Sequence, residues 1–324
     1  MKRKPRIVFM GTPEFAVAHL KKLVENDYNV VGVITAVDKP AGRGKKLHES
    51  PVKKYARSAG LPVLQPKNLK SDDFIRELKK WQPDLQVVVA FRMLPEVVWR
   101  LPARGTFNMH ASLLPDYRGA APINWAIING EKETGVTTFF IDDKIDTGEI
   151  ILQEKVPVEA HDNAGSLHDK LMEKGSDLVL QTVDLITQGK VKTTPQPQVE
   201  MPKKAPKLNR ENTRIDWRQP AEKIHNLIRG LAMYPGAWTE ISFGNDSPRK
   251  FIIYKSRFEN IPHHELPGTI TADKKNMKIA VADGYIYPET VKLQGKKQMD
   301  IVSFLNGIRN KNALKISSIN HRLI

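Results

Sequence analysis

The chain contains no cysteine among its 324 residues. This excludes disulfide frameworks, cysteine nucleophiles and thiolate metal sites. Its nine histidines show no His-Glu-x-x-His or similar ligand spacing, so we expect no metal. No apolar run approaches the roughly 18 residues that a membrane helix needs, and residues 1–5 lead into a strand pattern rather than a signal peptide. We therefore expect a cytoplasmic protein without a membrane partner.

The composition favours a globular protein with a basic C-terminal part. With 324 residues, of which 40% are apolar and 27% charged, the chain is long enough for two domains. Its net charge of +15 favours a polyanionic partner such as nucleic acid, although such a charge can also serve solubility alone. Residues 206–324 hold 20 Lys or Arg against 11 Asp or Glu, a net charge of +9.

The first half of the sequence alternates between apolar strand runs and amphipathic helices, which predicts an α/β domain with a parallel-rich sheet. The run over residues 6–10 is followed by a helix and by a second run over 30–34. Residues 85–90 are the most apolar run and should form a central strand. The glycine turn after residue 10 lacks the G-x-G-x-x-G pattern, so we expect no dinucleotide site.

A change in composition marks a domain boundary. Residues 189–209 carry four prolines and little periodicity, which is typical of an interdomain linker. We therefore predict a first domain over 1–189, a linker over 190–209 and a second domain over 210–324. In the second domain a helix is expected over 220–231. Five short strand patterns follow, which is typical of a small β-barrel of the oligonucleotide-binding type: 237–243, 250–257, 268–271, 277–281 and 285–293.

Polar side chains gather in the stretch GTFNMHASLLPDYRGAAP, residues 105–122. Asn108 and His110 are two residues apart, so on an extended strand they point to the same face. An amide can donate to an oxygen that gains negative charge, and an imidazole can exchange a proton near neutral pH, so this pair favours a reaction centre. A polar strand end with a hydrogen-bonded histidine is the alternative. Asp146, in a loop after a later strand, would add a carboxylate.

Residues 36–50 form a long loop in which two glycines surround three cations, Arg43, Lys45 and Lys46. Loops of this length within compact α/β units are often functional. The pattern fits an arm that closes on a phosphate or a nucleic-acid strand, and it fits a solvated charge run equally well.

Seven motifs are spread over essentially the whole chain: VFMGTPEFA (8–16), KPAGRGKK (39–46), NMHASLLPDYRGAAPI (108–123), TGVTTF (134–139), IDTGEI (145–150), RIDW (214–217) and YPGAW (234–238). Through these motifs the chain resembles the methionyl-tRNA formyltransferases. The resemblance implies a Rossmann-like N-terminal formyltransferase domain and an OB-like C-terminal β-barrel that binds tRNA. It also implies transfer of the formyl group of 10-formyltetrahydrofolate to the α-amino group of methionine on initiator methionyl-tRNA, for translation initiation. We expect the protein to be a monomer.

Residue by residue, the resemblance assigns the catalytic asparagine, histidine and aspartate to Asn108, His110 and Asp146. It places the cofactor-binding segment at Ser112, Leu113, Leu114 and Pro115, and the tRNA contacts at Arg43, Lys45 and Lys46. The amine would attack the formyl carbon, Asn108 and His110 would stabilise the oxyanion, and Asp146 would orient His110 and accept the amine proton, directly or through water.

The sequence departs from the family pattern at two places that flank the expected pterin pocket. Many members have Tyr-Gly where this chain has Phe91-Arg92, and a glycine where it has Lys144. The shape and charge of that pocket therefore stay open.

Two other functions compete with this interpretation. A folate-dependent formyltransferase for another amine, a nucleotide or an amino-sugar nucleotide, would not need a basic domain after residue 205. A nucleic-acid-binding protein with an inactive α/β domain would not need the combination of Asn108, His110 and Asp146.

Overall fold

The computed structural model describes residues 4–41 and 46–317 of the chain. The chain forms two compact units, neither of which is continuous in sequence. The first comprises the described residues of Met1–Gly119, Glu133–Pro157 and His168–Lys204. The second comprises those of Ala120–Lys132, Val158–Leu167 and Ala205–Ile324.

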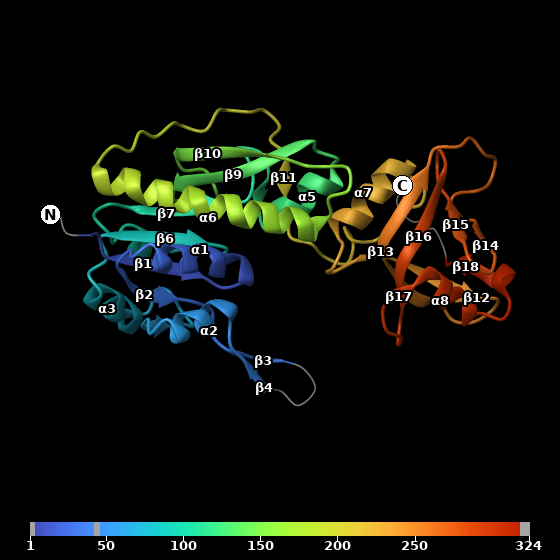
Figure 1. The fold of residues 1–324 in the computed structure, drawn as a ribbon, viewed down its shortest axis with the longest axis horizontal. Coiled ribbons are helices and arrows are strands. Elements are labelled where there is room, and N and C mark those ends of the chain that lie inside the picture. Colours follow the sequence, from blue (N-terminus) through green and yellow to red (C-terminus); the bar gives the residue numbers. More distant parts are fainter. Residues whose placement is uncertain (1–3, 42–45, 318–324) are drawn as a thin grey trace. The chain divides into compact units, whose positions relative to one another are not determined.

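The first unit is built on a seven-stranded sheet in the order β10-β9-β7-β6-β1-β2-β5 (Figure 1). The neighbouring strands β5, β2, β1, β6 and β7 are parallel to one another. At the other edge, β9 is antiparallel to β7 and β10 is antiparallel to β9. The apolar run near residues 85–90 forms β6, the fourth of the seven strands, as the sequence predicts. The strands are β1 (Ile7–Gly11), β2 (Val30–Ile34), β5 (Val63–Leu64), β6 (Leu85–Val89), β7 (Thr106–His110), β9 (Glu133–Phe140) and β10 (Ile150–Pro157).

Helices cover both faces of this sheet, which confirms the predicted Rossmann-like class. On one face α3 packs Phe74, Ile75 and Leu78 against Val8 and Val88, because positions i, i+1 and i+4 share one side of a helix. The opposite face carries α1 and α6. The helices are α1 (Glu14–Glu25), α2 (Pro51–Ser58), α3 (Asp72–Lys80), α4 (Glu96–Trp99) and α6 (Ala164–Gln188), of which the last begins in the second unit.

Four short strands complete the first unit. The strands β3 (Lys39–Ala41) and β4 (Lys46–His48) form an antiparallel hairpin within the loop that the sequence predicts over 36–50. Two further strands, β8 (Arg118–Gly119) and β11 (Lys204–Ala205), pair with each other, and β11 ends with Ala205 of the second unit.

The packing of α1 buries a histidine. His19 is fully buried, and its Nδ1–H donates to the Phe15 carbonyl oxygen at 2.8 Å. Its Nε2 is buried without a hydrogen-bond partner among the described residues. Burial is the main cause that lowers the pKa of His19 from 6.5 to about 4.

The stability of the first unit should therefore fall in mild acid. Between pH 6.5 and about 4 the unfolded chain binds a proton that the folded chain excludes, so unfolding becomes easier as the pH falls through this window. At pH 5 the loss amounts to about 2 kcal/mol. Urea unfolding at pH 8 and pH 5 should show this loss in the wild type and not in His19→Leu. Equal losses in both proteins would contradict the assignment.

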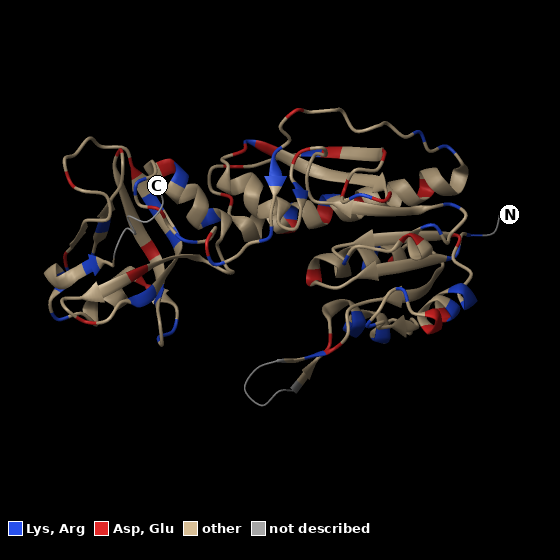
Figure 2. Cartoon of the chain, turned by 180° about the vertical axis from the view of Figure 1, so that it is seen from behind, with Lys and Arg blue, Asp and Glu red and all other residues tan. Residues whose placement is uncertain are grey.

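The second unit contains a nearly closed antiparallel barrel, as the sequence predicts. Its sheet has the order β14-β15-β16-β13-β12-β18, with β17 paired to β16, and the edge strands β14 and β18 approach each other. Inward side chains such as Phe251, Ile253 and Ile286 form its core. Figure 2 shows Lys and Arg on several elements of this unit, together with Asp and Glu. The strands are β12 (Ala237–Phe243), β13 (Arg249–Glu259), β14 (Ile270–Ala272), β15 (Met277–Ala280), β16 (Tyr285–Leu293), β17 (Met299–Asp300) and β18 (Leu314–Ile316).

Helices from distant parts of the sequence pack beside this barrel. The helix α5 (Pro122–Ile128) lies against α7 (Ala221–Gly230), and Asn124 Nδ2 donates to the Gly230 carbonyl oxygen at 2.8 Å. The remaining helices of the unit are α8 (Ile301–Asn306) and the 3-10 turn η1 (Lys311–Ala313). Across the described ranges, no helix is both long and apolar enough to cross a membrane.

Candidate active site

The strand β7 carries Asn108 and His110 at the carboxyl edge of the parallel part of the sheet. Asn108 pairs with Val88 on β6 and with Phe139 on β9, so it sits between two buried strands. Its Oδ1 atom is buried and has no hydrogen-bond partner among the described residues. Because buried polar atoms are normally paired, this oxygen can still accept a hydrogen bond.

His110 is held by the backbone rather than by a side chain. Its Nε2–H donates to the carbonyl oxygen of Tyr117 at 2.9 Å, and since a carbonyl can only accept, this bond fixes the proton on Nε2. The other ring nitrogen, Nδ1, lies 3.9 Å from Asp146 Oδ2. His110 and Asp146 are both nearly buried, with side chains that are 9% and 12% exposed. The fold thus brings a carboxylate to the free nitrogen of the ring.

Two turns with unusual backbone conformations bring these groups together. Tyr117 and Asp146 have φ values of 61° and 55°, in the left-handed region that residues other than glycine rarely adopt. Between them, the backbone N–H of Gly119 donates to Asp146 Oδ2 at 3.0 Å. Strained residues of this kind cluster at functional sites, where the surrounding structure holds them in place.

The segment Ser112–Pro115, expected to bind the cofactor, is anchored against β9 and β10. The Thr137 hydroxyl donates to the Ser112 carbonyl oxygen at 2.6 Å and accepts from the Leu114 N–H at 3.2 Å. Gln153 Nε2 donates to the Leu114 carbonyl oxygen at 2.9 Å. Leu113 and Pro115 keep partly exposed surface. The segment is therefore a rigid wall beside His110.

The residues that depart from the family pattern lie as follows. Arg92 points toward the loop after β5, where its guanidinium donates to the carbonyl oxygens of Pro66 and Lys67, the latter at 3.0 Å. It also lies 5.7 Å from the centre of the Phe91 ring. Lys144 is exposed in the loop that precedes Asp146. Arg92 thus links the loop after β6, in which it lies, to the loop after β5.

The predicted tRNA contacts fall, in the sequence, between β3 and the start of β4. Arg43 and Lys45 lie outside the described residues, and the side chain of Lys46 does too. Their role stays a prediction.

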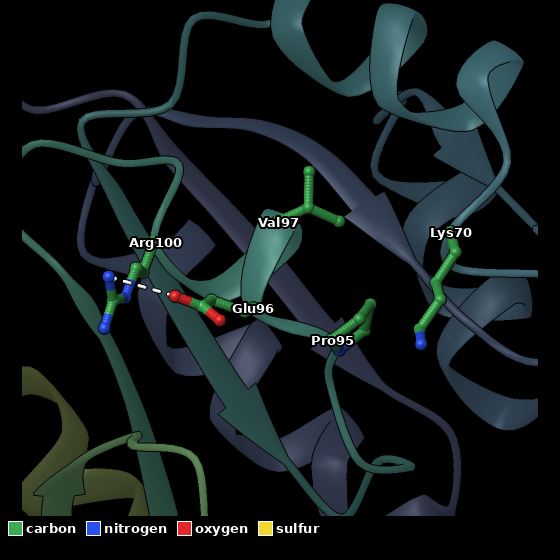
Figure 3. Close-up of a pocket in the computed structure, with 5 residues that line it drawn as sticks. All are labelled: Lys70, Pro95, Glu96, Val97 and Arg100. Atoms are coloured by element: carbon green, nitrogen blue, oxygen red, sulfur yellow. Dashed lines mark ion pairs between the residues drawn. The ribbon is translucent and has the colours of Figure 1, made fainter.

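An open pocket of the first unit lies beside α4 (Figure 3). It is lined by Lys70, Pro95, Glu96, Val97 and Arg100. Glu96 and Arg100 point toward each other and form an ion pair at 3.0 Å, with both side chains about two-thirds exposed. None of the three predicted catalytic residues lines this pocket, so it has no evident part in their chemistry.

The donor set of the site suits proton transfer and oxyanion stabilisation. Within the described ranges, no group of three or more His, Cys, Asp or Glu side chains is placed to hold a metal ion. An amide, an imidazole and a carboxylate are groups that acyl-type transfer to an amine can use.

Comparisons with known proteins decide the family. A profile described as formyl transferase matches residues 5–183, and one described as formyl transferase, C-terminal domain, matches residues 207–309. A methionyl-tRNA formyltransferase of Bacteroides fragilis is 51% identical over 320 residues, covering 97% of this chain and 98% of the relative. One from Flavobacterium johnsoniae is 52% identical over 313 residues, covering 97% and 99%. The chain belongs to the methionyl-tRNA formyltransferase family.

Solved structures with lower identity share the fold of this formyltransferase family member. The sugar 3N-formyl transferase WlaRD, crystallised with dTDP and 5-N-formyl-THF, matches with a TM-score of 0.64 and 21% identity, covering 91% of this chain and all of that chain. HypX from Aquifex aeolicus, in complex with tetrahydrofolic acid, matches with a TM-score of 0.63 and 19% identity, covering 94% of this chain and 47% of its own.

Several residues around the site carry no signal in the sequence. The Tyr117 carbonyl and the Gly119 N–H act through the backbone, so side-chain chemistry does not reveal their roles. Thr137 and Gln153 look like ordinary polar positions of alternating strands. Gln196 lies in a segment with the composition of a linker. A search for polar residues opposite the 108–115 stretch on β9 and β10 could have found Thr137 and Gln153.

Proposed function

We propose that this member of the methionyl-tRNA formyltransferase family transfers the formyl group of 10-formyltetrahydrofolate to the α-amino group of methionine on initiator methionyl-tRNA, for translation initiation. The single observation that carries the proposal is the near full-length identity of 51% to a protein of that name. The folate co-substrate is supported by the family and by two related folds crystallised with folates. We propose further that the protein acts as a cytoplasmic monomer.

In the proposed reaction the neutral α-amine attacks the formyl carbon. A new N–C bond forms and the bond from the formyl carbon to folate N10 breaks. The amine loses one proton, to Asp146 directly or through water, and N10 takes up one proton from the same carboxyl group or from water. Asn108 would donate through Nδ2 to the oxygen that becomes negative. His110, whose Nε2–H is engaged by Tyr117, would donate from a protonated Nδ1. Asp146 would stabilise that imidazolium and take the amine proton, directly or through water.

The assignment of residues 112–115 to the folate and of Arg43, Lys45 and Lys46 to the tRNA belongs to the same proposal. The anchored wall of Ser112–Pro115 beside His110 supports the first assignment. The family resemblance alone supports the second. We likewise propose a catalytic domain over 1–189, a linker over 190–209 and a tRNA-binding domain over 210–324.

An acceptor assay tests the proposed function. Purified protein with 10-formyltetrahydrofolate should formylate initiator methionyl-tRNA at least about a hundredfold faster than it formylates free methionine or an amino-sugar nucleotide, because only the charged tRNA offers a polyanion for the basic C-terminal part. Formylated methionine released from the tRNA is the product to measure. Glu96→Gln, in the pocket beside α4, serves as a control that should leave the rate unchanged. Preference for the sugar nucleotide would overturn the proposal.

A further inference from the structure

The segment over residues 190–203 follows α6 and belongs to the first unit, where it is hydrogen-bonded near both of its ends (Figure 1). Near its start, Thr194 and Ile150 exchange two backbone hydrogen bonds of 2.9 Å. Near its end, the Lys203 carbonyl oxygen accepts from the Tyr117 N–H at 2.6 Å, and the Lys203 N–H donates to Asp116 Oδ1 at 3.0 Å. The second anchor therefore includes Tyr117, the residue whose carbonyl oxygen accepts the hydrogen bond from His110.

Between these anchors, one side chain binds three groups of the site. Gln196 Nε2 donates to the backbone carbonyl oxygens of Asp146 and Gly148, each at 2.9 Å. Gln196 Oε1 accepts from Arg118 Nε at 3.2 Å. Since Arg118 lies in the turn that binds His110, this amide links that turn to the loop that carries Asp146.

The Asp146 loop has an unusual backbone and packs closely against β9. Asp146 has a left-handed backbone, and Gly148 fits so closely against the end of β9 that a Cβ there would lie 1.6 Å from the Phe140 carbonyl oxygen. The carboxylate of Asp146 itself is fixed by the Gly119 N–H. Its 3.9 Å distance from His110 Nδ1 leaves it close to the ring without a direct hydrogen bond. A small shift of this loop would therefore separate the two groups.

We propose that Gln196 is a positioning residue for the formyl transfer, which holds the Asp146 carboxylate at His110 by binding the loop backbone. This proposal rests on the proposed function. Misplacing a catalytic group by about 1 Å can cost a hundredfold in rate. We therefore expect Gln196→Ala to lower kcat about tenfold to a hundredfold. The KM for the folate and the dissociation constant for tRNA should stay within about twofold, because Gln196 contacts neither in this scheme.

Two variants distinguish a positioning role of Gln196 from a role in folding alone. Gln196→Glu keeps the side-chain length and an acceptor for Arg118, but it loses both donors to the loop carbonyls, so it should lose as much kcat as Gln196→Ala. Gln198→Ala removes an exposed glutamine from the same segment and should match the wild type. If Gln196→Ala fails to fold, as its thermal unfolding would reveal, Gln196→Glu decides the question by itself.

A double-variant cycle gives the sharpest test. If Gln196 acts through Asp146, then Gln196→Glu should cost nothing further in an Asp146→Ala background when single-turnover rates are measured. An equal loss in both backgrounds, or wild-type kcat in Gln196→Glu, would overturn the proposal. Its failure is distinct from failure of the proposed function, because the wild type formylates methionyl-tRNA in the first case and does not in the second.

Discussion

Replacing His110 by alanine should lower the turnover of formyl transfer to methionyl-tRNA by at least about a hundredfold, as expected for a group that stabilises a developing charge. The fold should persist, because the substitution removes one side-chain hydrogen bond, to the Tyr117 carbonyl, and leaves the strand pairing of β7 intact. Binding of the tRNA should be nearly unchanged. The exposed His161 offers a matched histidine-to-alanine control that should keep full activity.

The same loss is expected for Asn108→Ala and Asp146→Ala, and the losses should not add. All three groups act on one transition state, so removing a second one should cost far less than removing the first. Turnover numbers of the single and double variants, measured with saturating folate and charged tRNA, check this. Near-normal turnover of His110→Ala would remove the proposed mechanism, and additive losses would show that the three residues act in separate steps.

The sequence predicts the strands that carry the site well, because the spacing of apolar residues reflects which side chains are buried. The apolar run near 85–90 gives the central strand, and the two-residue spacing of Asn108 and His110 gives their common strand β7. The five strand patterns after residue 237 all appear in the barrel, with bounds shifted by up to two residues. The very short elements β17 and β18 escape such analysis, since two or three residues show no period.

Contacts made by the backbone could not be predicted in the same way. The Tyr117 carbonyl that binds His110 and the Gly119 N–H that binds Asp146 depend on left-handed turns and on tertiary placement. The segment 190–203 has the composition of a linker, and its hydrogen bonds to Ile150 and Tyr117 are likewise backbone contacts. No residue pattern encodes them. Gln196 was missed because one polar residue among prolines carries no signal by itself.

The outer face of the barrel concentrates positive charge. In β13, Phe251 and Ile253 point into the core, so Lys250 and Ile252 point outward. Residues that pair directly across strands share a face, and Ile252 pairs with Lys292 on β16.

Strand β12 extends this outer face to a third lysine. On β12, Trp238 pairs with Ile252 and Glu240 pairs with Lys250, so these two residues of β12 face outward. Ser242 follows them on the same side of β12 and pairs with Lys315 on β18, so Lys315 also faces outward. Two arginines, Arg210 and Arg214, also lie over the Trp238 ring at 5.2 and 5.3 Å. The face thus carries cations that can attract a nucleic-acid backbone.

A variant with Lys250, Lys292 and Lys315 all replaced by alanine should bind initiator tRNA about a hundredfold more weakly at about 0.15 M salt. Each lysine that binds a phosphate releases a counterion, so the slope of log affinity against log salt should become shallower by about 0.9 for each such lysine removed, or about 2.7 in all. The fold should be retained, because the three side chains point away from the core of the second unit.

A control variant with the same change in net charge distinguishes a specific binding face from a general effect of charge. Lys274, Lys275 and Lys297 lie exposed in turns between strands, outside the outer face defined above. Their replacement by alanine lowers the net charge by the same amount. If only net charge attracts the RNA, both triple variants should lose affinity equally, whereas a binding face on β13, β16 and β18 predicts a large loss for the first variant alone. Unchanged salt slopes in both would mean that the barrel does not bind the phosphate backbone and that the tRNA is bound elsewhere on the chain.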